Sequence, residues 1–124
     1  MRNTFLFIGM ALVGAWAIVL VVWTTDSTAA FRAWYWLAAI PVLCILSAVL
    51  GYWIPRHAWR WGVAPLLGQW MWEVVPSGTQ IGTGNLGPFA HAVVFAEYAL
   101  TAVLCIVAAE IAAFLSRRGA RADR

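Results

Sequence analysis

The strongest pattern in this chain is two long apolar runs that contain no charged residue. They extend from Thr4 to Trp23 and from Ala33 to Ile54, and further apolar stretches follow towards the C-terminus. Roughly 20 residues, at a rise of about 1.5 Å each, cross the apolar core of a bilayer as one helix. The pattern predicts four membrane-spanning helices, over about residues 4–23, 31–54, 58–75 and 89–115.

The third predicted helix has a different composition from the others. Its apolar stretch is the shortest of the four and contains Gly62, Pro65 and Gly68. A proline inside a helix removes one backbone donor and collides with the preceding turn. We therefore expect this helix to be the least regular element, bent or frayed between Gly62 and Gly68.

The polar segments between these helices are too short to fold on their own, so residues 1–124 are predicted to form a single domain. Hydrophobic residues make up 64% of the chain and charged residues 10%, which leaves too few polar side chains to cover the helices in water. The predicted fold class is an all-α integral membrane protein, a four-transmembrane-helix bundle with a short, Pro/Gly-interrupted third helix. The first apolar run exceeds a signal-peptide core of about 7–15 residues and is expected to be retained.

The distribution of arginine predicts how the bundle is oriented. All eight basic residues are arginines, a usage typical of GC-rich bacterial genomes. With four spans and a cytoplasmic N-terminus, only Arg32 lies outside, and the other arginines, including those of the basic tail 116–124, lie inside. Because cytoplasmic segments carry an excess of basic residues, we expect a multi-pass protein of the bacterial inner membrane with both termini in the cytoplasm.

Glu97 is the acid that the pattern places deepest in the membrane. It lies about nine residues into the fourth predicted helix, near the middle of the bilayer. An ionised carboxylate at that depth costs about 2.5–3.5 kcal/mol or more, so the group is protonated, paired or in contact with water. Thr101 follows one turn later on the same face and can donate a hydrogen bond. Glu97 and Thr101 are therefore a candidate proton or ion site; the alternative is a buried, protonated acid with a structural role.

Other polar residues lie where the predicted helices meet the membrane surfaces. On the outer side, Glu73, His91 and Arg32 form a possible polar cluster. On the inner side, Glu110 precedes Arg117 by seven residues on one side of the helix, so the two form a possible ion pair, with Arg56 or Arg60 as alternative partners for the acid. The residues expected to anchor anionic lipid headgroups follow the last span directly and are Arg117, Arg118 and Arg121.

The histidines and cysteines do not predict a cofactor or a metal site. His57 and His91 lie at opposite membrane surfaces and cannot bind one haem iron within a monomer. Cys44 and Cys105 lie at a similar depth and can face each other, but small buried thiols are the ordinary case in packed helices. We expect no bound cofactor.

Two functions follow from these patterns. No HExxH, GxSxG or Walker sequence occurs, and the scattered arginines do not form a nucleic-acid-binding stripe. Alanines four residues apart, such as Ala92 and Ala96, are typical of closely packed membrane helices. We therefore expect a small non-enzymatic membrane protein that acts through helix–helix contacts, as an accessory or self-assembling component of a homo-oligomer or larger membrane complex. The alternative is an oligomeric proton-coupled small transporter or channel that uses Glu97.

Overall fold

A computed structural model of the chain describes residues 2–24, 28–74 and 87–122, and all the secondary structure in these ranges is helical. The elements are α1 (Arg2–Thr24), α2 (Thr28–Trp34), η1 (Tyr35–Ala39), α3 (Ile40–Trp53), α4 (Trp59–Val74) and α5 (Gly87–Ala122). Because α2, η1 and α3 follow one another without a break, they form one long helix with a π-helical segment inside it. The all-helical fold class is confirmed, and the arrangement is consistent with a four-helix bundle.

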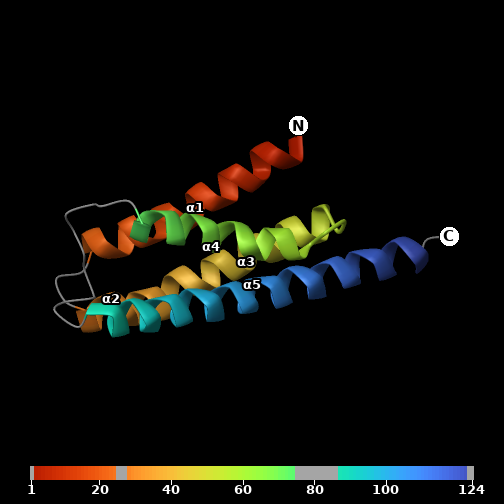
Figure 1. Cartoon of the computed structure of the whole chain (residues 1–124). Helices are drawn as coiled ribbons and strands as arrows, with labels where there is room; N and C mark the ends of the chain where they lie inside the picture. Colours follow the sequence, from red (N-terminus) through yellow and green to blue (C-terminus); the bar gives the residue numbers. More distant parts are fainter. Residues whose placement is uncertain (1, 25–27, 75–86, 123–124) are drawn as a thin grey trace.

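The helices run alternately up and down, and both ends of the chain lie at the same end of the bundle (Figure 1). Helix α4 packs against both α1 and α5, whereas α3 packs mainly along α5. The N-terminal end of α1 stands apart from the other helices (Figure 1). We call the end that carries the termini the terminal end and the other one the loop end.

Three of the described helices are long and apolar enough to cross a membrane. Their spanning segments are Asn3–Val21, Arg32–Trp53 and Ala92–Ala120. Helix α4 has 16 residues, which gives it a length of about 24 Å. Large apolar side chains cover the outside of the bundle, and Leu37, for example, is 78% exposed. Such an extended apolar surface is typical of a protein that is covered by lipid or by a partner.

The prediction that the third helix is the least regular is wrong. The helix α4 is unbroken from Trp59 to Val74 although Pro65 lies inside it. The irregular turn lies instead in the second long helix, where η1 precedes Pro41 and the N–H of Ile40 bonds the carbonyl of Tyr35. A proline ring collides with the carbonyl four residues earlier, and a π-helical turn makes room for it.

A hydrogen bond from a neighbouring helix explains why α4 tolerates its proline. Pro65 has no N–H, so the carbonyl of Trp61, four residues earlier, loses its donor within the helix. The hydroxyl of Ser47 on α3 donates to this carbonyl at 3.1 Å, and both Ser47 and Trp61 are buried. Neighbouring Ser and Thr side chains are a known means of satisfying backbone groups that a proline frees in membrane helices.

Four glycines allow close approach in three pairs of helices. A methyl group at Gly14 of α1 would overlap the backbone of Pro65, and one at Gly68 of α4 would overlap the carbonyl of Ala11. On the other side of α4, Gly62 faces the backbone of Ile106, and Gly51 of α3 faces Ala109 of α5 in the same way. Small residues at such contacts let backbones pack without intervening side chains.

We predict that the effect of removing the Ser47 hydroxyl depends on Pro65. Ser47→Ala is expected to lower the free energy of unfolding by about 1 kcal/mol, because the Trp61 carbonyl is then left buried without a donor. In a Pro65→Ala background, the restored N–H serves that carbonyl, and the same substitution should cost close to nothing. Unfolding of the four proteins of this cycle in detergent measures both values. An equal cost in the two backgrounds would contradict the explanation.

Candidate functional site

Glu97 of α5 forms an ion pair with Arg32 of α2. The Arg32 Nη2 lies 3.0 Å from the Glu97 Oε1, and the two side chains are 57% and 21% exposed. Glu97 is therefore paired, which is one of the three states expected for an acid at its predicted depth in the membrane. The pair lies towards the loop end, and the more exposed Arg32 reaches the surface there.

Of the expected outer cluster of Arg32, Glu73 and His91, only the side chain of Arg32 is described. The side chains of Glu73 and His91 lie outside the described part of the chain. Arg32 itself has Glu97 as its partner.

Thr101 does not bond the Glu97 carboxylate, as the sequence suggested, but the backbone carbonyl of the same residue, at 2.9 Å. Its hydroxyl also lies 3.1 Å from the Tyr35 hydroxyl, which in turn donates to the Gln69 Oε1 at 3.2 Å. Tyr35, Gln69 and Thr101 are each at most 2% exposed and come from η1, α4 and α5. We call these three residues the polar triad. It joins three helices in the interior of the bundle.

The triad has fewer hydroxyl hydrogens than contacts. Tyr35 and Thr101 carry one each, but three contacts connect them with Gln69 and the Glu97 carbonyl. The Gln69 Nε2 is buried with no partner among the described residues. A half-turn of this amide would let its nitrogen donate to Tyr35, and each contact would then have its own hydrogen. The triad therefore has two hydrogen-bonding arrangements related by the Gln69 amide.

One turn further along α5, two thiols face each other. The Cys44 Sγ of α3 and the Cys105 Sγ of α5 are 3.6 Å apart, and both are free cysteines. The sequence placed the two cysteines at a similar depth, and in the structure their sulfur atoms are in contact. Among the described residues no three His, Cys, Asp or Glu side chains lie together as a metal site would need. The thiol pair packs α3 on α5 and adds soft, weakly polar atoms to the interior.

The expected inner ion pair has different partners in the structure. Glu110 accepts a hydrogen bond from the backbone N–H of Trp59 at 3.1 Å, at the first residue of α4. Arg117 donates to the carbonyl of Pro55. A carboxylate is favourable at a helix N-terminus, where backbone N–H groups lack partners, and an arginine equally suits free carbonyls. The two side chains therefore each attach α5 to the α3–α4 turn and do not bond each other.

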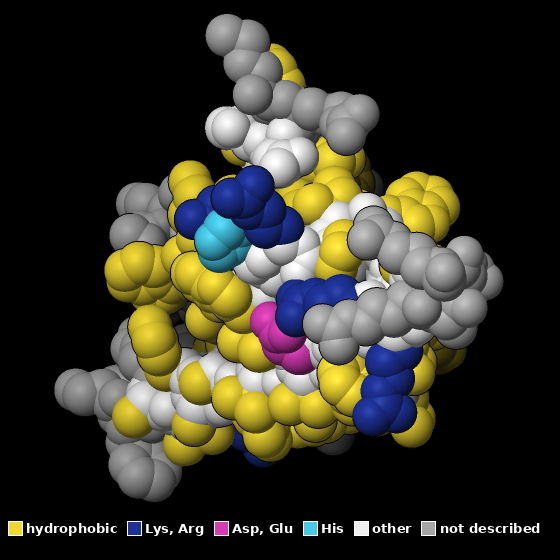
Figure 2. Space-filling view, turned by 90° about the vertical axis from the view of Figure 1, so that its right-hand side faces the viewer, with side chains coloured by type: hydrophobic (Ala, Val, Ile, Leu, Met, Phe, Trp, Pro, Cys, Tyr) yellow, Lys and Arg dark blue, Asp and Glu magenta, His cyan; other side chains and the backbone are white. Residues whose placement is uncertain are grey.

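Basic side chains gather at the terminal end of the bundle. Figure 2 looks onto this end and shows arginine side chains and a histidine among hydrophobic ones. Of the residues expected to anchor headgroups, Arg117 and Arg118 are exposed there, and the Arg118 guanidinium lies 4.4 Å from the centre of the Phe114 ring. The side chain of Arg121 lies outside the described residues.

Sequence reasoning missed two members of the triad. Tyr35 and Gln69 are not among the candidate residues that the sequence patterns indicate, whereas Thr101 is. The available signal was that both lie within apolar stretches, where polar side chains usually turn to a neighbouring helix. Which helix faces them depends on the packing and cannot be read from spacing.

Comparisons of this chain with protein-family models, with curated proteins and with solved structures find no match.

We predict a small effect on stability when the Glu97 charge is removed. Glu97→Gln should lower the free energy of unfolding by about 1 kcal/mol or less, because Arg32 is more than half exposed and solvent screens the pair. With Arg32→Gln already present, the substitution should cost less than it does alone. Detergent unfolding of the two single variants and the double variant measures this. A loss of several kcal/mol would show that the pair is far better shielded than its exposure indicates.

Proposed function

We propose that this chain is a small, non-enzymatic, multi-pass membrane protein that acts through contacts between its helices and those of other subunits. One observation carries the proposal: the outside of the bundle is apolar along its length, whereas its interior polar groups bond mainly to one another. A surface of this kind gains stability in lipid or against another apolar helix. It supports a role as an accessory or self-assembling component of a membrane complex.

We further propose that all four helices cross the bacterial inner membrane, with the terminal end in the cytoplasm. Support comes from the grouping of charge. Arg56 and Arg60 lie beside the start of α4, and Arg117 and Arg118 lie near the end of α5, so the fold brings these four to the end that carries both termini (Figures 1 and 2). Arg32 lies towards the opposite end. An excess of arginine on one side favours the cytoplasm for that side.

This orientation predicts that reporter fusions at Gly84 and at the C-terminus respond on opposite sides of the membrane. The C-terminal fusion should be active as a cytoplasmic reporter, and the Gly84 fusion as a periplasmic one. The same side for both would mean that α4 returns to the surface it entered, so the four-span proposal would fail.

The structure separates alanines that pack within the bundle from those that are available to a partner. Ala109 and Ala113 are fully buried, and the backbone of Ala11 lies against Gly68. Ala92 and Ala96, on the other hand, are exposed on α5. The face with Ala92 and Ala96 is therefore the one on which we propose that a partner helix packs.

We predict that Ala96→Leu weakens an assembly seen in mild detergent and leaves the monomer folded, because the larger side chain prevents close approach of a partner helix. Ala120→Leu, the same change at another exposed alanine of α5, is the matched control and should leave the assembly intact. Native mass spectrometry of the three proteins reports the oligomeric state. Unchanged assembly in Ala96→Leu would remove this face from the proposal.

The alternative function, a proton-coupled transporter or channel that uses Glu97, is favoured by one feature. The backbone of Glu97 continues into the polar triad, so hydroxyl and amide groups lead from the ion pair into the bundle. Under this alternative, the Glu97→Gln protein, although nearly as stable, would lose proton-coupled flux in proteoliposomes. If the protein instead acts through assembly, neither the wild type nor the Glu97→Gln variant should show such flux.

A further inference from the structure

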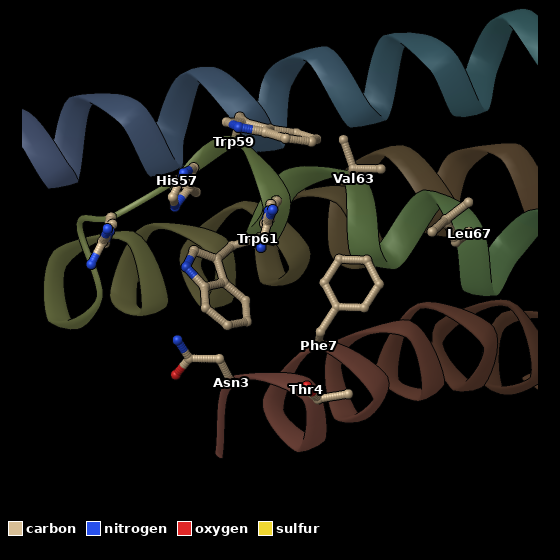
Figure 3. A pocket seen from close by; sticks show the side chains of 10 residues that line it. Asn3, Thr4, Phe7, His57, Trp59, Trp61, Val63 and Leu67 are labelled. Atoms are coloured by element: carbon tan, nitrogen blue, oxygen red, sulfur yellow. The ribbon is translucent and has the colours of Figure 1, made fainter. Parts of the chain in front are cut away.

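A pocket of about 460 Å³ opens between the first turns of α1 and the start of α4 at the terminal end. Figure 3 shows Asn3, Thr4 and Phe7 of α1 on one side and the residues of α4 and of the turn before it on the other. The pocket exists because the N-terminal end of α1 stands apart from the bundle (Figure 1). Its volume is within the range of about 300–1,000 Å³ that is usual for small-molecule sites.

The rim of this pocket is basic. Arg56, His57 and Arg60 line it and are exposed, and among its described lining residues none is acidic. The Arg60 guanidinium lies 5.7 Å from the centre of the Trp59 ring, which holds the charge beside an aromatic surface. The partial positive charge at the N-terminus of α4 is offset by a carboxylate and does not add to the rim. Glu110, the nearest described acid, is already bonded to the Trp59 backbone at the first turn of that helix.

The wall below the rim is apolar. Phe7 of α1 and the side chains of Val63 and Leu67 on α4 line it and are half-buried. Val63 and Leu67 are four residues apart, so they form a strip along α4 that leads from the charged rim towards the middle of the bundle. Figure 3 shows Val63 and Leu67 successively farther along α4 from His57, with Phe7 of α1 on the facing side. The pocket is therefore amphipathic along its length.

The turn that carries part of the rim holds an unfavourable backbone conformation. His57 has a φ of 60°, in the left-handed region, and is the single non-glycine residue with a positive φ among the described residues. A conformation of this kind is unfavourable for a residue that has a side chain and persists where the surrounding structure holds it. Here it turns the chain between Arg56 and Arg60 so that both line one pocket.

We propose that this pocket binds a single anionic glycerophospholipid, with the phosphate at Arg56, His57 and Arg60 and one acyl chain along Phe7, Val63 and Leu67. The inference rests on the proposed membrane location, in which the terminal end lies at the level of the cytoplasmic headgroups. Basic pockets between helices on that side are typical sites for anionic headgroups. A polar rim continuous with an apolar wall fits an amphiphile better than a free anion, which would leave the apolar wall uncovered.

The test uses the purified full chain in detergent and native mass spectrometry with phosphatidylglycerol. The variant Arg56→Gln/Arg60→Gln should retain the lipid roughly 10- to 30-fold more weakly, because two cations that face the phosphate are removed. Arg32→Gln is the matched control, since it also removes an exposed positive charge but lies towards the loop end, outside the pocket. It should bind like the wild type.

A second variant tests the apolar wall without changing any charge. Val63→Phe fills the pocket and should reduce retention of phosphatidylglycerol even if the double arginine variant fails to fold. Phosphatidylcholine with the same acyl chains should bind weakly, and inorganic phosphate should not displace the anionic lipid. Unchanged binding in Val63→Phe, equal loss in Arg32→Gln, equal binding of phosphatidylcholine or displacement by phosphate would each overturn the proposal. Because binding in detergent requires neither orientation nor assembly, these results are independent of the reporter and oligomer experiments.

Discussion

The helix α4 keeps a proline at its centre because α3 supplies the hydrogen bond that the proline removes. The Ser47 hydroxyl bonds the Trp61 carbonyl, and it can do so only if α3 and α4 lie close together. Glycines bring both helices close to α5, where Gly51 of α3 meets Ala109 and Gly62 of α4 meets Ile106. In an apolar surrounding, an unpaired backbone group is costly. Helix α4 therefore stays continuous only if the bundle packs closely enough for Ser47 to reach the Trp61 carbonyl.

The same requirement explains the partners of the other polar groups. Several polar groups find a partner on another part of the chain: Glu110 at the first N–H of α4, Arg117 at the carbonyl of Pro55, and Tyr35 between Gln69 and Thr101. The first two bonds lie at exposed positions near helix ends, and the third lies in the interior. The outer surface along the helices is left apolar, and this is the basis of our proposal that the protein acts through its helix faces.

The two ends of the bundle differ in a way that bears on the membrane. Towards the loop end, Arg32 is paired with Glu97, so its charge is balanced. At the terminal end, Arg56 and Arg60 are on the rim of a pocket without a facing acid among the residues that line it. Unbalanced positive charge beside an apolar wall attracts anionic amphiphiles. The asymmetry that orients the protein in our proposal is thus also the basis of the proposed lipid site.

The sequence by itself predicted the helical fold class, because long apolar runs satisfy their backbone groups within a helix. It also indicated that Glu97 needs a partner and that Cys44 and Cys105 share a level. Only the tertiary structure decided which residue forms a hydrogen bond or ion pair with each polar group. Glu110 was assigned to Arg117 from spacing along one helix, but the free N–H at the start of α4 lies within its reach. For the same reason, the proline positions led to a wrong prediction of which helix is irregular. The hydrogen-bond donor that the Trp61 carbonyl needs comes from Ser47 on another helix, and no local sequence pattern indicates this donor.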